Sequence, residues 1–510
     1  MKIHELLQRN ANRFPSKTFL YTAKKSVTYR DASEIVNNAA AGLRSLGVSV
    51  GDRVEFLAPD SIEYVLGMLA TFRLGAIASL IDVADSEYFS AHTKTIEPKA
   101  LFISSELASK FESTLKEMRE IRPVCLDGGG ENWTIRWEEL QESGNGKVET
   151  HFDDMAPCHL SFTSGTTYQP KPVVLSQEPT VRATRVISER FGISPDEITL
   201  TITPYSNSHV LVYGFLPQLH KAATTGFIEG AWDTSTGPKQ CWDLIKQRSV
   251  TFLSGHTYRL RPVADYALLH KQRRVSLRKV VSGGGPSYLS LRKKWQQLGV
   301  SFLETYGMSE CGGAVAATPP HAFKIGKSVA RPGVPSCGPV LSDKEVRIVD
   351  EHDTELPPGQ VGEITFRGGY MWGYWRMDDE TKKKTRSGWL HTDDFGYIDE
   401  FDNVYWLSRN TDLIHTRTGT IYPRITEEVL YLHKGIMQAS VISVEDTSTG
   451  ETPWAFVVPY PNRKLSEEAL LRFCGRKLPK EYIPSRIIIK TSLPLTASGK
   501  IEKKALRHFV

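Results

Sequence analysis

Two segments of this chain combine residue types that could bind phosphate groups and a metal ion. The first runs from Thr163 to Lys171 and reads Thr-Ser-Gly-Thr-Thr-Tyr-Gln-Pro-Lys. Its backbone N–H groups and hydroxyls could donate hydrogen bonds to an oligophosphate, and Lys171 could supply charge. The segment lacks the Walker pattern G-x-x-x-x-G-K-[ST], and a loop of this composition is by itself more often a solvated turn.

The second segment is Tyr306-Gly307-Met308-Ser309-Glu310. Glu310 could hold Mg²⁺ on nucleotide phosphates, because Mg²⁺ prefers carboxylate oxygens, and Tyr306 could stack on a base. Taken alone, the segment is more typical of a plain turn with a surface glutamate, since exposed acids are common.

Two further segments each offer a charged side chain that could meet a nucleotide. In residues 388–397, Asp394 could accept hydrogen bonds from both hydroxyls of a ribose, although Asp-Asp is also ordinary turn chemistry. In residues 495–501, Lys500 lies on a glycine-bearing loop and could bridge a carboxylate and an α-phosphate during attack. A lone lysine near a C-terminus is more often solvated.

Elements of an α/β fold surround these segments. Residues 28–47 are typical of a capped helix that a glycine ends, and 53–57 of a strand. Asp60 with Glu63 could cap a second helix, after which 76–81 has the pattern of another strand. Strand, helix and strand in this order form the unit of a parallel sheet.

The same unit recurs later in the chain. Residues 279–282 form an apolar strand that ends in Gly283-Gly284-Gly285-Pro286, a helix is expected over 291–298, and the strand 300–303 runs into 305–307. Open α/β sheets bind ligands in the loops after the carboxyl ends of parallel strands, where both glycine-bearing loops would lie.

The last hundred residues have a separate pattern. Strands are expected at 437–444, 454–458 and 487–489, and a helix at 465–476, with a domain boundary near 409–412. We therefore predict an α/β protein with a large N-terminal domain of mixed and parallel sheets with flanking helices, residues 1–410, and a small α+β domain, residues 411–510. A chain of 510 residues exceeds a single ordinary core, which agrees with two domains.

Composition limits the class of function. The net charge of +5 is too small for this length to indicate nucleic-acid binding. The six cysteines are far apart in the sequence, and no two of them form a C-x-x-C motif. This pattern fits a reducing cytoplasm. The most apolar stretch, 64–81, contains Arg73 and two glycines, so we expect no membrane span, and the first residues lack the profile of a signal peptide.

In their order and spacing, the four segments at 163–171, 306–310, 388–397 and 495–501 resemble those of the adenylate-forming superfamily, which comprises acyl-CoA synthetases, peptide-synthetase adenylation domains and luciferases. The resemblance covers essentially the whole chain. Besides the four segments, it includes Gly284-Gly285-Pro286, Gly362-Glu363-Ile364, Gly373-Tyr374, Ser408-Arg409 with Asp412, and Pro423.

The resemblance implies a role for each matching residue. The residues that would hold the β,γ-phosphates are Thr163, Ser164, Gly165, Thr166, Thr167 and Lys171. Those that would line the adenine and its surroundings are Gly284, Gly285, Pro286, Tyr306 and Gly307. Glu310 and Thr166 would ligate Mg²⁺, Asp394 and Arg409 would bind the ribose, and Lys500 would be the adenylation lysine.

The acyl site is less well marked. Residues 204–209 lie where the family often has Pro-x-x-His beside the acyl pocket; here Asn207 takes the usual histidine register and His209 follows two residues later. His209 could gate the pocket or orient a carboxylate, and a packed or surface histidine is an equally good interpretation. The resemblance also places Tyr258 and Gly307 near this site.

The implied reaction uses ATP, Mg²⁺ and coenzyme A. A small carboxylic acid would be activated as acyl-AMP, a thiol would then take the acyl group, and the small mobile domain would rotate between the two steps. The acceptor could instead be the arm of a separate acyl carrier protein, and a non-catalytic or half-reaction nucleotide-binding member is a third hypothesis. We expect a free-standing cytoplasmic enzyme, a monomer or homodimer, with no nucleic acid or membrane as partner.

Several residues differ from the family pattern. Tyr168 and Pro172 stand where the phosphate loop usually has glycine, Asp393 replaces the glycine before Asp394, and Ser408 replaces the glycine before Arg409. In addition, a glycine of the C-terminal domain, Gly419, comes one residue late.

Overall fold

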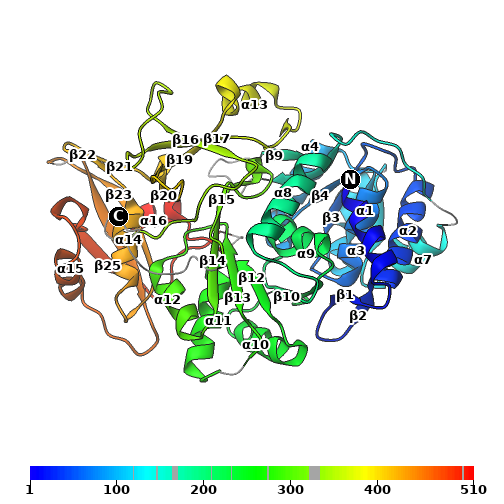
Figure 1. The fold of residues 1–510 in the computed structure, drawn as a ribbon, viewed down its shortest axis with the longest axis horizontal. Coiled ribbons are helices and arrows are strands. Elements are labelled where there is room, and N and C mark those ends of the chain that lie inside the picture. Colours follow the sequence, from blue (N-terminus) through cyan, green and yellow to red (C-terminus); the bar gives the residue numbers. More distant parts are fainter. Residues whose placement is uncertain are drawn as a thin grey trace.

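The computed structural model shows four β-sheets with helices packed around them (Figure 1). One end of the molecule holds the first residues of the chain, the other end holds the C-terminal sheet, and β12 to β14 lie between them. The structure describes residues 1–118, 120–144, 148–162, 171–207, 210–230, 232–272, 275–320, 333–448, 450–496 and 499–510.

The first eight-stranded sheet is mainly parallel and has the strand order β18-β9-β8-β4-β3-β5-β6-β7. Its strands are β3 (Arg53–Leu57), β4 (Ile77–Leu80), β5 (Ala100–Ile103), β6 (Arg122–Cys125), β7 (Ile135–Arg136), β8 (Pro157–Phe162), β9 (Pro172–Ser176) and β18 (Gly373–Tyr374). The predicted strand–helix–strand unit is confirmed, because β3 and β4 pair in parallel and α3 (Ile62–Arg73) connects them.

The second eight-stranded sheet has the order β15-β14-β13-β12-β10-β11-β1-β2. Its strands are β1 (Thr18–Tyr21), β2 (Ser26–Thr28), β10 (Ile198–Thr201), β11 (Thr224–Phe227), β12 (Phe252–His256), β13 (Lys279–Gly283), β14 (Ser301–Tyr306) and β15 (Ala316–Ala317). The second predicted unit is also confirmed, since β13 and β14 are parallel and α12 (Leu289–Gln297) lies between them in the chain.

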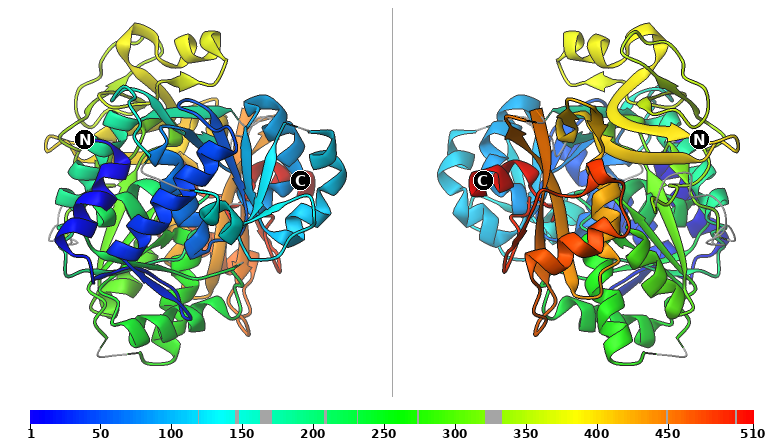
Figure 2. Two further views of the ribbon diagram at one scale, coloured as in Figure 1. Left: turned by 90° about the vertical axis from the view of Figure 1, so that its right-hand side faces the viewer. Right: turned by 90° about the vertical axis from the view of Figure 1, so that its left-hand side faces the viewer.

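Two smaller sheets follow. The antiparallel sheet β16-β17-β19-β20 contains β16 (Glu345–Val349), β17 (Gly362–Arg367), β19 (Leu390–Ile398) and β20 (Val404–Arg409). The C-terminal sheet contains β21 (Ile414–Thr416), β22 (Gly419–Ile421), β23 (Ile436–Asp446), β24 (Gly450–Pro459) and β25 (Arg486–Ile489). Figure 2 shows the four-stranded sheet and α13 projecting at the top of the molecule, beside the other sheets.

The remaining helices cover the sheets. They are α1 (Ile3–Arg13), α2 (Tyr29–Ser45), α4 (Phe89–Ile96), α5 (Ser105–Lys110), α6 (Glu112–Glu117), α7 (Trp137–Glu142), α8 (Gln177–Arg190), α9 (Leu216–His220), α10 (Gly237–Arg248), α11 (Thr257–Leu269), α13 (Asp378–Lys384), α14 (Pro423–Tyr431), α15 (Glu467–Gly475) and α16 (Lys503–Leu506). The fold is thus a large mixed α/β N-terminal domain with a small C-terminal α+β domain, as predicted.

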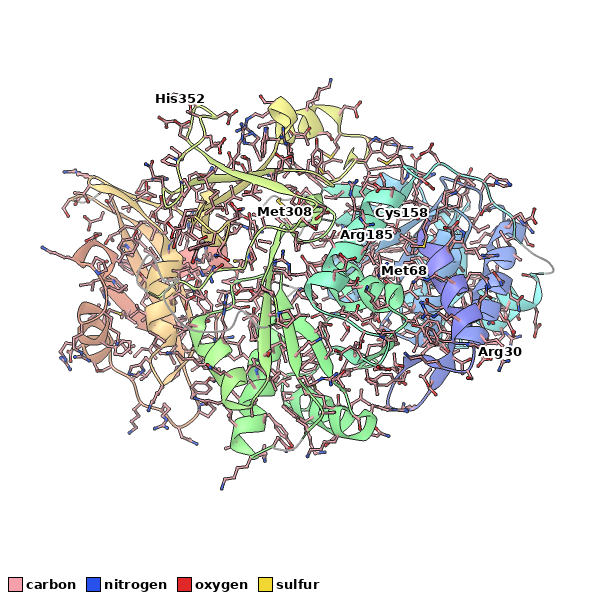
Figure 3. The ribbon with its side chains drawn as sticks, in the orientation of Figure 1. Arg30, Met68, Cys158, Arg185, Met308 and His352 are labelled. Atoms are coloured by element: carbon pink, nitrogen blue, oxygen red, sulfur yellow. The ribbon has the colours of Figure 1, made fainter. Side chains whose placement is uncertain are left out.

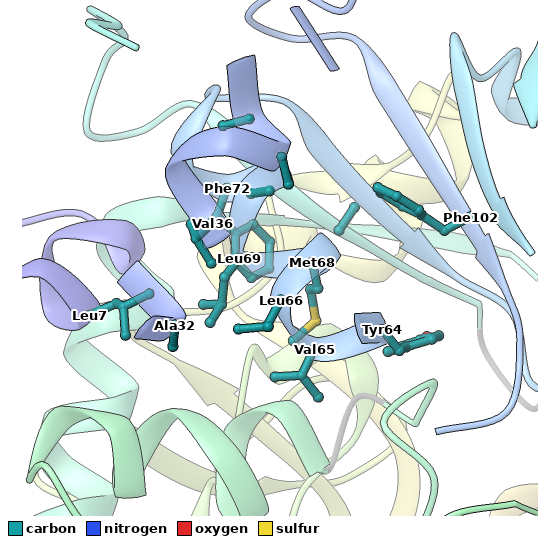
Figure 4. Packing of buried hydrophobic residues seen from close by; sticks show 14 of the residues in the cluster. Leu7, Ala32, Val36, Tyr64, Val65, Leu66, Met68, Leu69, Phe72 and Phe102 are labelled. Atoms are coloured by element: carbon teal, nitrogen blue, oxygen red, sulfur yellow. The ribbon is translucent and has the colours of Figure 1, made fainter. Parts of the chain in front are cut away.

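The largest apolar core lies where α1, α2 and α3 pack on the first sheet (Figure 4). Phe72 and Met68 of α3, Val36 of α2 and Phe102 of β5 all belong to it and are buried. Burial of each large apolar side chain contributes roughly 1.5–3 kcal/mol, so this cluster holds the three helices on the first sheet.

One capping prediction is confirmed and another is wrong. Thr28 caps α2, because its side-chain oxygen accepts a hydrogen bond from the Asp31 N–H at 3.2 Å. The cap of α3 is Ser61 instead of Asp60. The Asp60 carboxylate accepts a hydrogen bond from the Tyr205 N–H at 3.0 Å, and this contact with a distant segment takes precedence over local capping.

The small domain docks on the large one through an aromatic and polar interface. The rings of Tyr288 and Tyr431 stack with their centroids 4.1 Å apart. The Tyr288 hydroxyl donates to the Glu427 carboxylate at 2.8 Å, and the Leu289 N–H donates to Glu428 at 3.0 Å. Because both glutamates belong to α14, this helix is held against the N-terminus of α12.

The cysteines are unpaired and buried. Among the residues that the structure describes, no helix has the length and apolar character needed to cross a membrane.

Candidate active site

The phosphate-binding prediction falls partly outside the described residues. Thr163, Ser164, Gly165, Thr166 and Thr167 lie outside them, and so do Tyr168 and, at the acyl site, His209. The sequence places the phosphate segment between β8 and β9, which pair with each other in antiparallel register.

Lys171 is the described end of this segment. Its ammonium group forms an ion pair with Glu380 of α13 and lies 5.3 Å from the centre of the Tyr374 ring. The Lys171 ammonium could also bind an anionic ligand, because such a ligand would compete with Glu380 for it.

Glu310 lies in a single 3₁₀ turn, Ser309–Cys311, that follows β14. The turn begins one residue after Met308, which Figure 3 labels near the middle of the molecule. Only 5% of Glu310 is exposed, and its Oε1 accepts a hydrogen bond from the Tyr374 hydroxyl at 2.8 Å. Its backbone carbonyl accepts from the Met371 N–H at 2.7 Å. The turn is therefore held by the segment around β18.

A carboxylate at this place fits Mg²⁺ by the chemistry of its oxygens. Across the described part of the chain, no group of three or more acidic, histidine or cysteine side chains could form a protein cage for a metal. Mg²⁺ commonly binds through one or two carboxylates together with substrate phosphates, and Glu310 suits that arrangement.

Asp394 and Arg409 come together because they face each other across the β19–β20 ladder. The Asp394 carboxylate accepts a hydrogen bond from the Tyr306 hydroxyl at 3.0 Å, and the Arg409 Nε lies 3.8 Å from its other oxygen. Burial raises the pKa of Asp394, while the Arg409 charge opposes that effect. Tyr306, expected to stack on adenine, thus also joins the end of β14 to the ribose-binding candidates.

The backbone explains why the family usually has glycine before this acid. Asp393 has a φ of +58°, in the left-handed region that favours glycine. A non-glycine residue there costs roughly 1–2 kcal/mol. Here the Asp393 N–H donates to Glu363 at 2.9 Å and its side chain pairs with Lys384, and both contacts stabilise the turn.

The predicted adenine loop follows β13. Gly284 has a φ of +77°, and a Cβ at this position would lie 2.8 Å from Nε2 of His256. A Cβ on Gly285 would meet no atom within 4 Å, so the chain leaves open space beside this residue. Pro286 ends the loop, and Gly307 lies where a Cβ would be 2.6 Å from the Gly313 carbonyl.

Lys500 reaches the same region from the small domain. Its N–H donates to Thr496 Oγ1 at 3.2 Å, and the preceding Gly499 lies so close to the Tyr258 ring that a Cβ there would be 2.4 Å away. Burial, together with the Arg409 charge, lowers the pKa of the Lys500 ammonium to about 8, and the Asp394 charge opposes this shift. The structure therefore brings Lys500, Asp394 and Arg409 into one electrostatic cluster between the domains.

Comparison with known proteins places this geometry in a family. The family model described as AMP-binding enzyme matches residues 7–375, and the model of the AMP-binding enzyme C-terminal domain matches residues 426–500. The chain belongs to the AMP-binding enzyme family. The first match covers more than half of the chain, and the second covers most of the small domain.

Among relatives of this AMP-binding enzyme, 2-succinylbenzoate--CoA ligase of Bacillus cereus is 28% identical over 527 residues, covering 99% of this chain and 98% of the relative. Feruloyl-CoA synthase of Amycolatopsis sp. is 28% identical over 507 residues, covering 98% and 97%. The crystal structure of the anthranilate CoA ligase AuaEII in complex with anthranoyl-AMP has a TM-score of 0.90 at 21% identity, covering 100% of this chain and 97% of that one. This last similarity concerns the fold.

The structure has a cavity beside the predicted adenine loop. It lies at the carboxyl ends of β10, β12 and β13 and against the π-helix Val210–Phe215. Its lining residues are Thr203, Val210, Tyr213, Gly214, Ser254, Gly255, His256, Val281, Ser282 and Gly283. This is the place where open α/β sheets bind ligands.

Two of the three described acyl-site predictions, Asn207 and Tyr258, lie close to residues that line this cavity. The Asn207 N–H donates to the Pro204 carbonyl at 3.0 Å, and the Asn207 carbonyl accepts from the Val210 N–H at the start of the π-helix. Tyr258 follows His256 by two residues and packs on Gly499 of the small domain.

Sequence reasoning missed Tyr213, His256 and Tyr374. Tyr213 lies in a π-helix, and no periodic pattern of residues in the sequence predicts a π-helix. His256 ends β12, and its position at the carboxyl end of a parallel strand could have indicated it. Tyr374 is part of the Gly373-Tyr374 pair in the family resemblance, but the sequence predicted no role for it, because its partner Glu310 is 64 residues away.

Proposed function

We propose that this AMP-binding enzyme joins a small carboxylic acid to coenzyme A in two steps, at the expense of ATP. The observation that carries the proposal is the proximity of the Lys500 charge to Asp394 and Arg409, which face each other on β19 and β20 while Asp394 also accepts a hydrogen bond from Tyr306. The names of the relatives support it, since they describe acid–CoA ligases of nearly the same length.

In the first step, a carboxylate oxygen of the acid attacks the α-phosphorus of ATP. The bond from that phosphorus to the bridging oxygen of pyrophosphate breaks, and pyrophosphate leaves. Lys500 stabilises the negative charge that builds up on the α-phosphate, and Asp394 with Arg409 holds the ribose in place. Little covalent chemistry is asked of the protein, so positioning and charge dominate.

The triphosphate would be held at the other end of the site. Lys171 would bind the β,γ-phosphates together with Thr163, Ser164, Gly165, Thr166 and Thr167. Glu310, with Thr166, would hold Mg²⁺, which neutralises phosphate charge when bound. Gly284, Gly285, Pro286 and Gly307 would border the adenine and the acyl group.

In the second step, the thiol sulfur of coenzyme A attacks the acyl carbon, the bond to the phosphate oxygen breaks, and AMP leaves. We place the domain boundary at residues 410 and 411, so that Lys500 belongs to the domain that moves between the steps. A cytoplasmic location agrees with the six buried, unpaired cysteines. A monomer and a homodimer both agree with this scheme, and loading of a separate carrier protein remains the alternative acceptor reaction.

The cavity beside β12 and β13 is our candidate acyl site, with Asn207, His209 and Tyr258 around it. Glycine at positions 214 and 255 leaves little freedom to add bulk, since a Cβ at Gly214 would be 2.9 Å from Thr201 Oγ1 and one at Gly255 2.6 Å from Ile202. The names of the relatives make aromatic acids the first to test.

A pyrophosphate-release screen tests the proposal. The purified enzyme receives ATP and Mg²⁺ with a panel of aryl, short aliphatic and amino acids, first without an acceptor and then with coenzyme A or a holo carrier protein. We expect release with a compact aryl or aliphatic acid and thioester formation with coenzyme A. If pyrophosphate is released but the thioester forms on the carrier protein and not on coenzyme A, the result would favour the alternative acceptor. If no acid leads to pyrophosphate release, the result would favour a non-catalytic member.

A further inference from the structure

Tyr374 touches both charged residues that would meet the nucleotide phosphates. Its hydroxyl donates to Glu310 Oε1 at 2.8 Å, and its ring centre lies 5.3 Å from the Lys171 ammonium. Tyr374 and Glu310 are only 6% and 5% exposed. One side chain thus connects the end of the phosphate segment to the turn after β14.

The backbone holds this tyrosine firmly between the two. Tyr374 pairs with Val173 of β9, and its own N–H donates to Thr381 Oγ1 at 2.9 Å. The neighbouring Trp375 N–H donates to the Pro172 carbonyl at 2.8 Å. Because β9 directly follows the phosphate segment, the ring of Tyr374 is fixed relative to Lys171.

The same short segment also holds the main chain of Glu310, through the Met371 N–H. With its main chain and its Oε1 both engaged, the Glu310 carboxylate has a defined direction. Its Oε2 accepts no hydrogen bond from the described residues, which leaves that oxygen for a ligand. A carboxylate oriented by a neighbouring donor binds a metal better than one that rotates freely.

We propose that Tyr374 is a positioning residue of the nucleotide site. Its hydroxyl orients Glu310 toward the metal bound to the nucleotide, and its ring seats Lys171 beside the β,γ-phosphates. This inference rests on the proposed function for the identity of the ligand. It assigns separable tasks to the two parts of the side chain, the hydroxyl and the ring.

The substitution Tyr374→Phe tests the hydroxyl alone, because it keeps the ring against Lys171. The readout is calorimetric binding of a non-hydrolysable ATP analogue at increasing Mg²⁺ concentration, with no acid or coenzyme A present. We expect the Mg²⁺ concentration for half-maximal binding to rise by roughly tenfold, the lower end of the range for residues that orient metal ligands. Binding of AMP, which lacks the β,γ-phosphates, should not change.

Tyr370→Phe is the matched control, since Tyr370 lies in the same segment and packs on the same apolar cluster. It should leave the Mg²⁺ dependence unchanged. Thr381→Val provides a second variant that perturbs Tyr374 through its backbone, and a smaller shift in the same direction is expected. Thermal unfolding of each variant shows whether it is folded.

A double-mutant cycle with Glu310→Gln separates positioning from general damage. If Tyr374 acts through Glu310, Tyr374→Phe has no further effect on Mg²⁺ dependence once Glu310 is replaced. An unchanged Mg²⁺ midpoint in folded Tyr374→Phe, an equal loss of AMP binding, or full additivity with Glu310→Gln overturns the inference. Wild-type protein that binds the analogue with Mg²⁺ but never releases pyrophosphate would overturn the proposed function and leave the inference standing.

Discussion

Replacing Lys500 by arginine should change the shape of the pH–rate profile as well as the rate. Burial and the nearby Arg409 charge lower the pKa of the Lys500 ammonium to about 8, with Asp394 opposing them. Lysine at 500 therefore loses its proton within the range in which the enzyme can be assayed. An arginine guanidinium stays charged throughout this range.

The size of the effect follows from that pKa. A group with a pKa of about 8 is about 90% protonated at pH 7 and about 10% protonated at pH 9. If only the charged form stabilises the α-phosphate, the first-step kcat/KM for ATP should fall by about tenfold between these pH values in the wild type. The Lys500→Arg variant should be slower at pH 7, because its longer planar head fits less well, but should show no such fall.

The assay is initial pyrophosphate release at low ATP and a saturating concentration of the acid, from pH 6.5 to 9.5. kcat/KM is the appropriate quantity because it reports ionisation in the free enzyme, to which the pKa of about 8 refers. The reasoning would be refuted by an alkaline fall of equal steepness in the wild type and the arginine variant, or by its absence in the wild type.

Three further variants test other parts of the structure. Burial raises the pKa of Glu55 to about 8, so the free energy of unfolding should fall as pH rises from about 4.5 through 8. The fall is at most about 5 kcal/mol. Glu55→Gln should remove this pH dependence, which denaturant titrations at pH 5 and pH 9 would measure. Glu380→Gln removes the ion pair between Glu380 and Lys171, so that Glu380 no longer competes with phosphate for this lysine. The Kd for ATP, measured by calorimetry, should fall by about two- to fivefold. A higher Kd would contradict this competition. Tyr288→Phe removes the hydroxyl that donates to Glu427 across the domains. Because an unmade buried hydrogen bond costs about 1–3 kcal/mol, the variant should slow pyrophosphate release by about 5- to 150-fold without changing ATP affinity; an unchanged rate would show that this contact does not hold the domains for the first step.

The sequence predicted those features whose cause is local. Thr28 with Asp31 carries its own helix cap, and the two strand–helix–strand units follow from apolar runs and glycines. The resemblance placed Asp394 and Arg409 at one ligand, and in the structure the two residues pair across the hairpin that β19 and β20 form.

Features that depend on distant segments were not accessible in this way. Asp60 has the sequence of a helix cap, but the Tyr205 N–H, 145 residues away, takes its carboxylate. The bond from Tyr374 to Glu310 and the ion pair from Lys171 to Glu380 likewise join segments from different sheets and loops. Local propensity contains no information on such contacts, because they arise only when the sheets have packed.

The central claim is that the small domain delivers a positive charge at Lys500 to the α-phosphate of a nucleotide held by the large domain. Rapid-quench measurement of acyl-AMP formation by Lys500→Ala, with ATP, Mg²⁺ and the acid found in the screen, tests it most directly. We predict a loss of roughly 100- to 1000-fold in that rate, with transfer from supplied acyl-AMP to coenzyme A nearly unchanged. Formation of acyl-AMP at the wild-type rate by this variant would contradict the account.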